Sequence, residues 1–112
     1  MSDCLFCKII AGEIPSNKVY EDDQCLAFYD IDPQAPTHFL VIPKPHIGSV
    51  AEVNEDNAAI VAHILTVIAQ QAKKLGLDSY RVVSNIGDQA GQTVPHLHFH
   101  VLSGRDMTWP PG

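Results

Sequence analysis

Histidine and apolar residues alternate with a period of two between positions 96 and 102, a pattern that predicts a β-strand. Because a strand directs successive side chains to opposite faces, His96, His98 and His100 should share one face, with the apolar residues on the other. Imidazoles that titrate near neutrality and stand in a row suit metal ligation, acid–base chemistry or nucleophilic attack. The alternative is an exposed strand face that happens to be rich in histidine, although histidine has no special preference for strands.

Four other segments have the composition of strands. The first two, 18–21 and 25–29, form a predicted hairpin around a turn at 22–24. A turn-rich connection at 32–36 leads to a strand at 38–42, and a further strand is predicted at 80–85. Since most of these strands are joined by short connections, an antiparallel sheet is expected.

Two helices are predicted beside these strands. A short N-terminal helix can begin at Ser2 or Asp3 as N-cap and end before Gly12. The one long helix spans 54–75, with Asn54 as its N-cap and Gly76 after its end. The expected fold is therefore α+β, a five-stranded antiparallel sheet with one long helix on one face and a short N-terminal helix. Apolar residues recur along the long helix at helical spacing: Ile60, Val61, Ile64, Leu65, Ile68, Ala72 and Leu75.

Length and charge limit the possible functions. The 112 residues are expected to form a single domain, 1–112, large enough to fold without disulfides. The net charge is −6 and the seven lysines and arginines are scattered, which argues against nucleic-acid polymers but allows a nucleotide. The N-terminus lacks a secretory signal pattern, and the most apolar stretch, 58–69, is too short to span a bilayer. We therefore expect a cytoplasmic protein without membrane association, whose three cysteines stay reduced.

Cys4 and Cys7 form a C-x-x-C pair one helical turn apart, which places both thiols on the same side. Thiolates and imidazoles are the ligands that zinc prefers, so the pair could bind zinc together with His46 and one histidine of the 96–100 segment. A redox pair or two buried small side chains are equally open readings. Cys25 alternates with strand residues and is expected in the core, and His63 lies on the polar side of the long helix with no chemical role.

The loop at 86–95 is small and polar and leads directly into the histidine segment. Its glycines, Gly87 and Gly91, allow main-chain amides to turn towards an anion. Such an anion would lie beside His98 and His100. An ordinary hairpin loop is the alternative, but the aligned imidazoles next to it favour a binding loop.

The complete motif at 96–102, His-apolar-His-apolar-His-apolar-apolar, resembles the signature of the histidine triad (HIT) superfamily of nucleotide hydrolases and transferases. The segments EDD and LAF before Asp30, the run PQAPTHFLVIPK at 33–44 and the ending WPPG resemble its Hint branch, so the resemblance covers nearly the whole chain. It implies a homodimer in which two five-stranded sheets join into one of ten strands. It also implies hydrolysis of the P–N bond of purine nucleoside 5′-phosphoramidates, with a purine nucleotide (AMP or GMP) bound.

The resemblance also implies roles for individual residues. His98 matches the nucleophile that forms a nucleotidyl-histidine, His100 would contact the phosphate and help to move a proton, and His38 would orient the triad. Asp30 matches the acid that binds ribose. The residues that match the purine pocket are Leu5, Phe6, Ile9, Phe28, Ile31 and Leu40, and those that match the phosphate contacts are Asn85, Gly91, Gln92, Thr93, His98 and His100.

A structural zinc ion is the cofactor that the resemblance implies. Many Hint members lack the cysteine pair, but similar pairs occur in bacterial HIT proteins and in the related galactose-1-phosphate uridylyltransferases. The matching ligands in this sequence are Cys4, Cys7, His46 and His96, which would give His96 a supporting rather than a catalytic role. A second departure is Thr93, which stands where Hint members more often have serine.

Two other functions compete with this hypothesis. The first is a dinucleoside polyphosphate hydrolase or nucleotidyltransferase on the same scaffold, which the third histidine, the short chain and the Hint-like ending disfavour. The second is a zinc-stabilised nucleotide-binding module whose catalysis is incidental, which the complete triad beside a phosphate loop disfavours.

Overall fold

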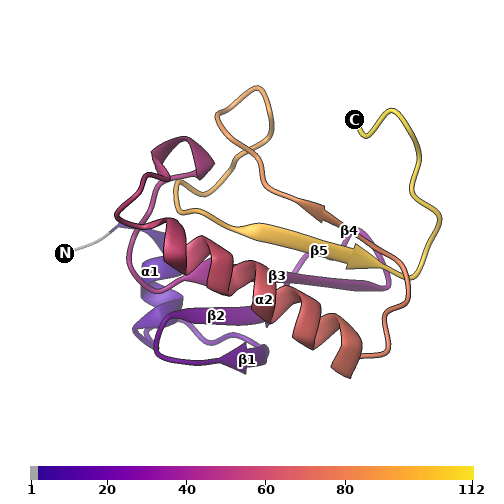
Figure 1. The fold of residues 1–112 in the computed structure, drawn as a ribbon, viewed down its shortest axis with the longest axis horizontal. Helices are drawn as coiled ribbons and strands as arrows, with labels where there is room; N and C mark the ends of the chain where they lie inside the picture. Colours follow the sequence, from indigo (N-terminus) through magenta and orange to yellow (C-terminus); the bar gives the residue numbers. More distant parts are fainter. Residues whose placement is uncertain (1–2) are drawn as a thin grey trace.

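The computed structural model describes residues 3–112 and has the α+β fold that the pattern predicts (Figure 1). Ser2, one of the two predicted helix caps, lies outside the described residues. No helix within residues 3–112 has the length and apolar content that crossing a bilayer requires. The elements in chain order are α1 (Leu5–Ile10), β1 (Lys18–Glu21), β2 (Cys25–Tyr29), β3 (Thr37–Pro43), a 3-10 helix η1 (Val50–Glu52), α2 (Ala58–Lys74), β4 (Tyr80–Val83) and β5 (Phe99–Ser103).

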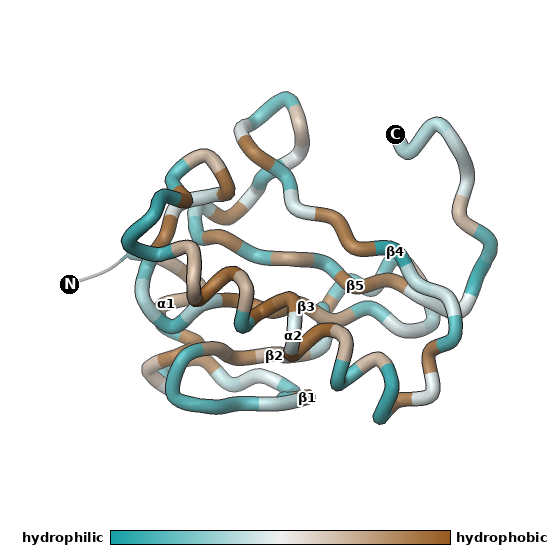
Figure 2. The backbone as a smooth tube through the Cα atoms, viewed as in Figure 1, coloured by the Kyte–Doolittle hydropathy of each residue, from teal (hydrophilic) through white to brown (hydrophobic). Residues whose placement is uncertain are grey.

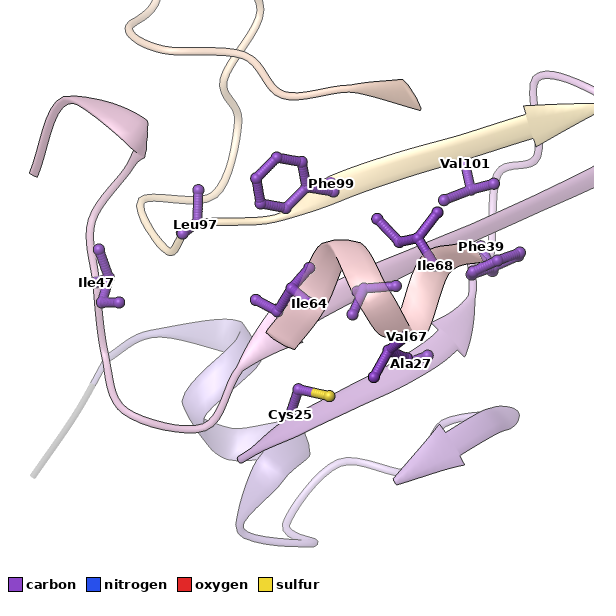
Figure 3. Packing of buried hydrophobic residues seen from close by; sticks show 11 residues of the cluster. Cys25, Ala27, Phe39, Ile47, Ile64, Val67, Ile68, Leu97, Phe99 and Val101 are labelled. Atoms are coloured by element: carbon purple, nitrogen blue, oxygen red, sulfur yellow. The ribbon is translucent and has the colours of Figure 1, made fainter. Parts of the chain in front are cut away.

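The five strands form one antiparallel sheet in the order β1-β2-β3-β5-β4, so β3 and β5 lie near its centre. Helix α2 crosses one face of the sheet in Figure 1. Its side chains pack with every second residue of β2, β3 and β5, and Figure 3 shows Ile64, Val67 and Ile68 against this cluster. In Figure 2 the apolar colour is strongest along β2 and β3 and recurs along α2, while the loops are mostly hydrophilic.

A second apolar cluster covers the opposite face of the sheet. Phe6 and Ile9 of α1 pack there on Leu26, Phe28 and other residues of β2 and β3. Because β2 is covered on both faces, four of its five residues are buried, and it has no hydrophilic side. The sheet therefore separates an α2 side from an α1 side, and alternation along each strand decides on which side a residue lies.

The histidine segment follows this alternation, although it forms less strand than predicted. The ladder of β5 begins at Phe99, because the Leu97 N–H donates to the Ile47 carbonyl oxygen at 2.6 Å instead of to a neighbouring strand. Leu97, Phe99 and Val101 all join the α2 side. The His96 and His98 rings pack edge to face on Phe6 of α1, with centroids 5.9 and 5.0 Å away, on the other side.

Both predicted helix starts need correction. Cys4, not Ser2 or Asp3, is the N-cap of α1, and its Sγ accepts a hydrogen bond from the Cys7 N–H at 3.4 Å. Helix α2 begins at Ala58 with Asn57 as N-cap, one turn later than predicted. Asn54 instead closes the preceding turn, where its Oδ1 accepts from the N–H groups of residues 56 and 57.

The buried stripe of α2 differs slightly from the predicted one. Leu65 and Leu75 are exposed, whereas Val67 and Gln71 are buried. The buried positions are 64, 67, 68, 71 and 72, which is the stripe expected when a helix meets the sheet along one line. Leu65 is apolar and yet exposed, so residue type alone did not identify the buried positions of this helix.

His63 has a structural partner, Asp22, that its position on the polar side of the long helix did not indicate. Its Nε2 lies 2.6 Å from Asp22 Oδ2, which joins α2 to the β1–β2 turn. Asp22 also accepts from the Gln24 and Cys25 N–H groups, both at 2.8 Å, and from the Tyr20 hydroxyl at 3.0 Å. Burial by itself would raise the pKa of the Asp22 carboxyl, but these donors outweigh it and hold that pKa well below its ordinary value.

The substitution Asp22→Asn should therefore lower the free energy of unfolding by about 1–3 kcal/mol, because it removes a charged acceptor of several hydrogen bonds. Since the pKa is lower in the folded state, this contribution should be complete above a pH of about 4 and decrease as acid protonates the carboxylate. Urea unfolding at several pH values measures both effects. The adjacent exposed Asp23→Asn is the control, and an equal effect from it would contradict this role of Asp22.

Candidate functional site

The histidines of the sheet region separate into two groups on the α1 side. His38 on β3 and His100 on β5 are diagonal neighbours, since His38 pairs with Leu102 and His100 with Leu40, and His98 lies next to them. His96, two residues earlier, points instead towards the N-terminal helix, where it meets His46 at a centroid distance of 4.8 Å. The fold thus places the cluster of His38, His98 and His100 beside the pair His46 and His96.

The His98 ring is held in one orientation. Its Nδ1 lies 2.7 Å from the His96 carbonyl oxygen, which can only accept, so Nδ1 carries the proton and Nε2 of the neutral ring has the lone pair. The main chain at His98 is fixed in turn, because Ser84 Oγ donates to the His98 carbonyl oxygen at 2.9 Å. The ring is 5% exposed and packs edge to face on Phe6. A buried, oriented imidazole with a bare nitrogen is suited to nucleophilic attack.

His38 and His100 form a pair beside it. His38 Nε2 lies 2.9 Å from His100 Nδ1 and 3.5 Å from Asp30 Oδ2. Burial lowers the pKa of the His38 imidazole, and burial with the neighbouring His98 and His38 lowers that of His100 to about 4. Both rings are therefore neutral at neutral pH.

A cavity of about 280 Å³ opens in front of these rings. Most of its wall is apolar, while Asp30, Thr93, His98 and His100 supply polar groups. It can hold a flat apolar group with a polar or anionic part beside the histidines. The residues that line it are Leu5, Phe6, Ile9, Ile14, Pro15, Phe28, Asp30, Ile31, Leu40, Thr93, Val94, His98 and His100.

Three of these lining residues, Ile14, Pro15 and Val94, were not among the sequence candidates. Ile14 and Pro15 follow α1 and come to the cavity only because the chain folds back after that helix. Val94 follows Thr93 directly, so its place next to a sequence candidate is the signal that could have identified it. Ile31 lines the cavity although its side chain is fully exposed, so it forms part of the rim.

Three predicted phosphate contacts, Asn85, Gly91 and Gln92, do not line the cavity but organise the loop that follows β4. Gly91 has φ +95°, a conformation that glycine adopts readily, and its carbonyl oxygen lies 3.5 Å from Asn85 Nδ2. Gln92 Oε1 accepts from the Gly87 N–H at 2.9 Å, and its Nε2 donates to the Gly48 carbonyl oxygen at 2.7 Å. The Gln92 side chain therefore joins this loop to the segment after β3.

Cys4, Cys7, His46 and His96 come together with all four ligand atoms within 4.8 Å of one another. Cys4 Sγ lies 3.3 Å from His96 Nδ1, and Cys7 Sγ lies 3.3 Å from His46 Nδ1. His96 Nε2 donates to the Pro43 carbonyl oxygen at 2.8 Å, so its Nδ1 lone pair is directed at the thiols. These four residues are close enough to hold a metal ion.

Comparison with known proteins agrees with this geometry. Residues 11–107 match the model of the HIT domain family. An uncharacterised HIT-like protein of Synechococcus elongatus is 50% identical over 111 residues, which cover 98% of this chain and 97% of the relative. A second uncharacterised HIT-like protein, from Synechocystis, is 48% identical with the same coverage.

Solved structures of similar proteins have the same fold. A HIT family hydrolase from Legionella pneumophila is 52% identical, with a TM-score of 0.95 over 98% of this chain and 100% of that protein. A HIT family hydrolase from Clostridium thermocellum is 48% identical, with a TM-score of 0.93 over 96% of each chain.

The role of Gln92 in the loop gives a prediction that needs no ligand. In Gln92→Glu, an oxygen replaces the Nε2 that donates to the carbonyl oxygens of Gly48 and Val94. The free energy of unfolding should fall by about 1–3 kcal/mol, because the new oxygen repels these carbonyl oxygens, and the amide hydrogens of the loop at 86–95 should exchange faster. Gln89→Glu makes the same charge change at an exposed position of this loop and should leave both measurements nearly unchanged. Equal losses of stability in the two variants would contradict the role of the Gln92 side chain in holding this loop.

Proposed function

Since this chain belongs to the HIT domain family and has the fold of HIT family hydrolases, we propose that it hydrolyses the P–N bond of purine nucleoside 5′-phosphoramidates. The observation that carries the proposal is His98 itself. Its bare Nε2 belongs to a buried, fixed ring that lines an apolar cavity, as in-line attack on a bound α-phosphorus requires.

The cavity suggests how such a substrate would lie. The purine would lie between apolar side chains such as Phe6, Phe28 and Leu40. The Asp30 carboxylate would accept hydrogen bonds from the ribose hydroxyls. The phosphate would then reach the histidines, with the hydroxyl of Thr93 and the amides of its loop as donors.

The reaction would proceed through a covalent intermediate. The His98 Nε2 lone pair would attack phosphorus, the P–N bond would break, and the departing amine would take up a proton with the help of His100. Water would then attack phosphorus, break the bond to His98 and release the nucleoside monophosphate. His38 orients His100, and donors to the phosphate oxygens stabilise the charge that develops in each step.

We also propose that the four-residue cluster binds zinc as a structural ion. Zinc prefers thiolate and imidazole ligands in a tetrahedron, in which ligand atoms lie about 3.3–3.8 Å apart given bonds of about 2.0 Å to nitrogen and 2.3 Å to sulfur. The contacts of 3.3–3.5 Å among Cys4, Cys7, His46 and His96 fit this arrangement. The ion would stabilise the N-terminal helix against the histidine segment.

A homodimer is the assembly that we propose. Among residues 3–112, strand β4 pairs with β5 alone and its other edge is open, and its Tyr80 and Val82 are exposed. Pairing of two such edges would extend the two sheets into one of ten strands and cover these side chains.

The nucleophile is tested by His98→Ala. Hydrolysis of adenosine 5′-phosphoramidate should fall by at least about 10³-fold, roughly 4 kcal/mol of barrier, while AMP binding by calorimetry changes little. Turnover within about tenfold of the parent protein would refute His98 as nucleophile.

His63→Gln is the matched control, because it removes an imidazole that lies outside the cavity. Its turnover should stay within about threefold at a temperature where the protein is folded. Diadenosine polyphosphates tested in parallel distinguish the competing enzyme function, and faster cleavage of these than of phosphoramidates would overturn the substrate assignment. Tight AMP binding without hydrolysis of either substrate would support a binding module instead.

Zinc is tested by elemental analysis of protein purified without added metal. The parent protein should contain about one ion per chain, and Cys4→Ser with Cys7→Ser should contain almost none. Cys25→Ala is the control, since Cys25 belongs to the α2-side core and should leave the zinc content unchanged. Unchanged zinc in the double variant would exclude these ligands.

A further inference from the structure

The turn at 33–36, just before β3, contains a main-chain donor that reaches the histidine site. The Gln34 N–H donates to His38 Nδ1 at 3.0 Å. An amide N–H can only donate, so His38 Nδ1 must present its lone pair. A neutral imidazole has one ring proton, and here it must be on Nε2. A His38 cation is disfavoured as well, because its Nδ1–H would face the amide N–H.

The proton on His38 Nε2 in turn determines the tautomer of His100. The His38 Nε2–H lies 2.9 Å from His100 Nδ1 and 3.5 Å from Asp30 Oδ2, so the shorter hydrogen bond goes to His100. His100 Nδ1 is then an acceptor, and the proton of the neutral His100 ring must be on Nε2. Burial of both rings favours these neutral forms.

His98 has the opposite arrangement. Its Nδ1–H donates to the His96 carbonyl oxygen, which leaves Nε2 bare. The His98 and His100 rings are neighbours, with centroids 5.0 Å apart, and both line the cavity. The site therefore combines one ring that offers a lone pair with an adjacent ring that offers an N–H.

We propose that Gln34 is a positioning residue, whose main-chain N–H fixes the tautomers of His38 and His100 so that His100 directs an N–H donor towards the phosphate. This inference rests on the proposed function for the identity of the group that accepts from His100. The turn thus decides that His100 donates, while the His96 carbonyl oxygen leaves His98 Nε2 free to attack.

The turn is braced from two sides. The Gln34 carbonyl oxygen accepts from Arg105 Nε at 2.9 Å, in the segment after β5. Gly104 packs on Pro36, and a Cβ at position 104 would lie 2.9 Å from the Pro36 Cβ. These contacts hold the Gln34 amide in place relative to β3.

The first test uses the unchanged, ligand-free protein with ¹⁵N-labelled histidine. Long-range ¹H–¹⁵N spectra at pH 7 should show His38 and His100 as neutral Nε2–H tautomers and His98 as the Nδ1–H tautomer. A scalar coupling should connect His38 Nε2 with His100 Nδ1. A proton on His100 Nδ1, or a His38 cation, would overturn the proposal.

The second test compares Gln34→Pro with Gln34→Ala. Both variants lose the hydrogen bond from Gln34 Nε2 to the Asp32 carbonyl oxygen and keep the carbonyl that Arg105 binds, but only proline removes the N–H. Gln34→Ala should keep the parent tautomers and kcat within about threefold. Gln34→Pro should lose the single His38 tautomer and the coupling, and its kcat should fall at least tenfold with little change in KM.

The pair of tests separates the two proposals. A Gln34→Pro protein with the parent spectrum and kcat would overturn the positioning role, and if this variant fails to fold, the spectrum of the unchanged protein still decides the matter. The expected tautomers without any phosphoramidate hydrolysis would refute the proposed function alone. Hydrolysis together with a His100 Nδ1–H tautomer would refute the positioning role alone.

Discussion

The hydrogen bond from His98 Nδ1 to the His96 carbonyl oxygen, 2.7 Å long, is the interaction on which the proposed chemistry depends. It turns a residue with two exchangeable tautomers into one with a single bare nitrogen. Main-chain groups act in the same way on its neighbours, since the Pro43 carbonyl oxygen fixes His96 and the Gln34 N–H fixes His38. The backbone thus assigns His38, His96 and His98 their protonated nitrogens before any ligand binds.

That control is possible because the sheet is covered on both faces. Burial removes water that would compete for the ring nitrogens, and it lowers the pKa of His38, His96 and His100. Phe6 of α1 contacts both the His96 and the His98 rings, so one apolar side chain packs between the cysteine–histidine cluster and the cavity. The same short segment therefore connects the two groups: the His96 ring faces the thiols, while its carbonyl holds His98.

Much of this could be predicted from local patterns. The two-residue period at 96–102 placed the histidines on one face, because alternation is a property of any extended chain. The hairpin, the long helix and the antiparallel sheet follow from apolar spacing and turn residues, but the strand order, with β5 between β3 and β4, does not. Local patterns were less informative at helix starts, where Asn54 was predicted as the N-cap of α2 but closes the preceding turn instead, so that the helix begins after Asn57.

What the sequence determined by itself was the set of chemical groups and the face on which they stand, since residue type and periodicity are local. Only the tertiary structure decided which groups meet. It brought Cys4 and Cys7 to His96, paired His63 with Asp22, and turned Gln92 towards the backbone of a distant segment. These are contacts between residues more than forty positions apart, and such contacts depend on how the whole chain packs rather than on any spacing along it.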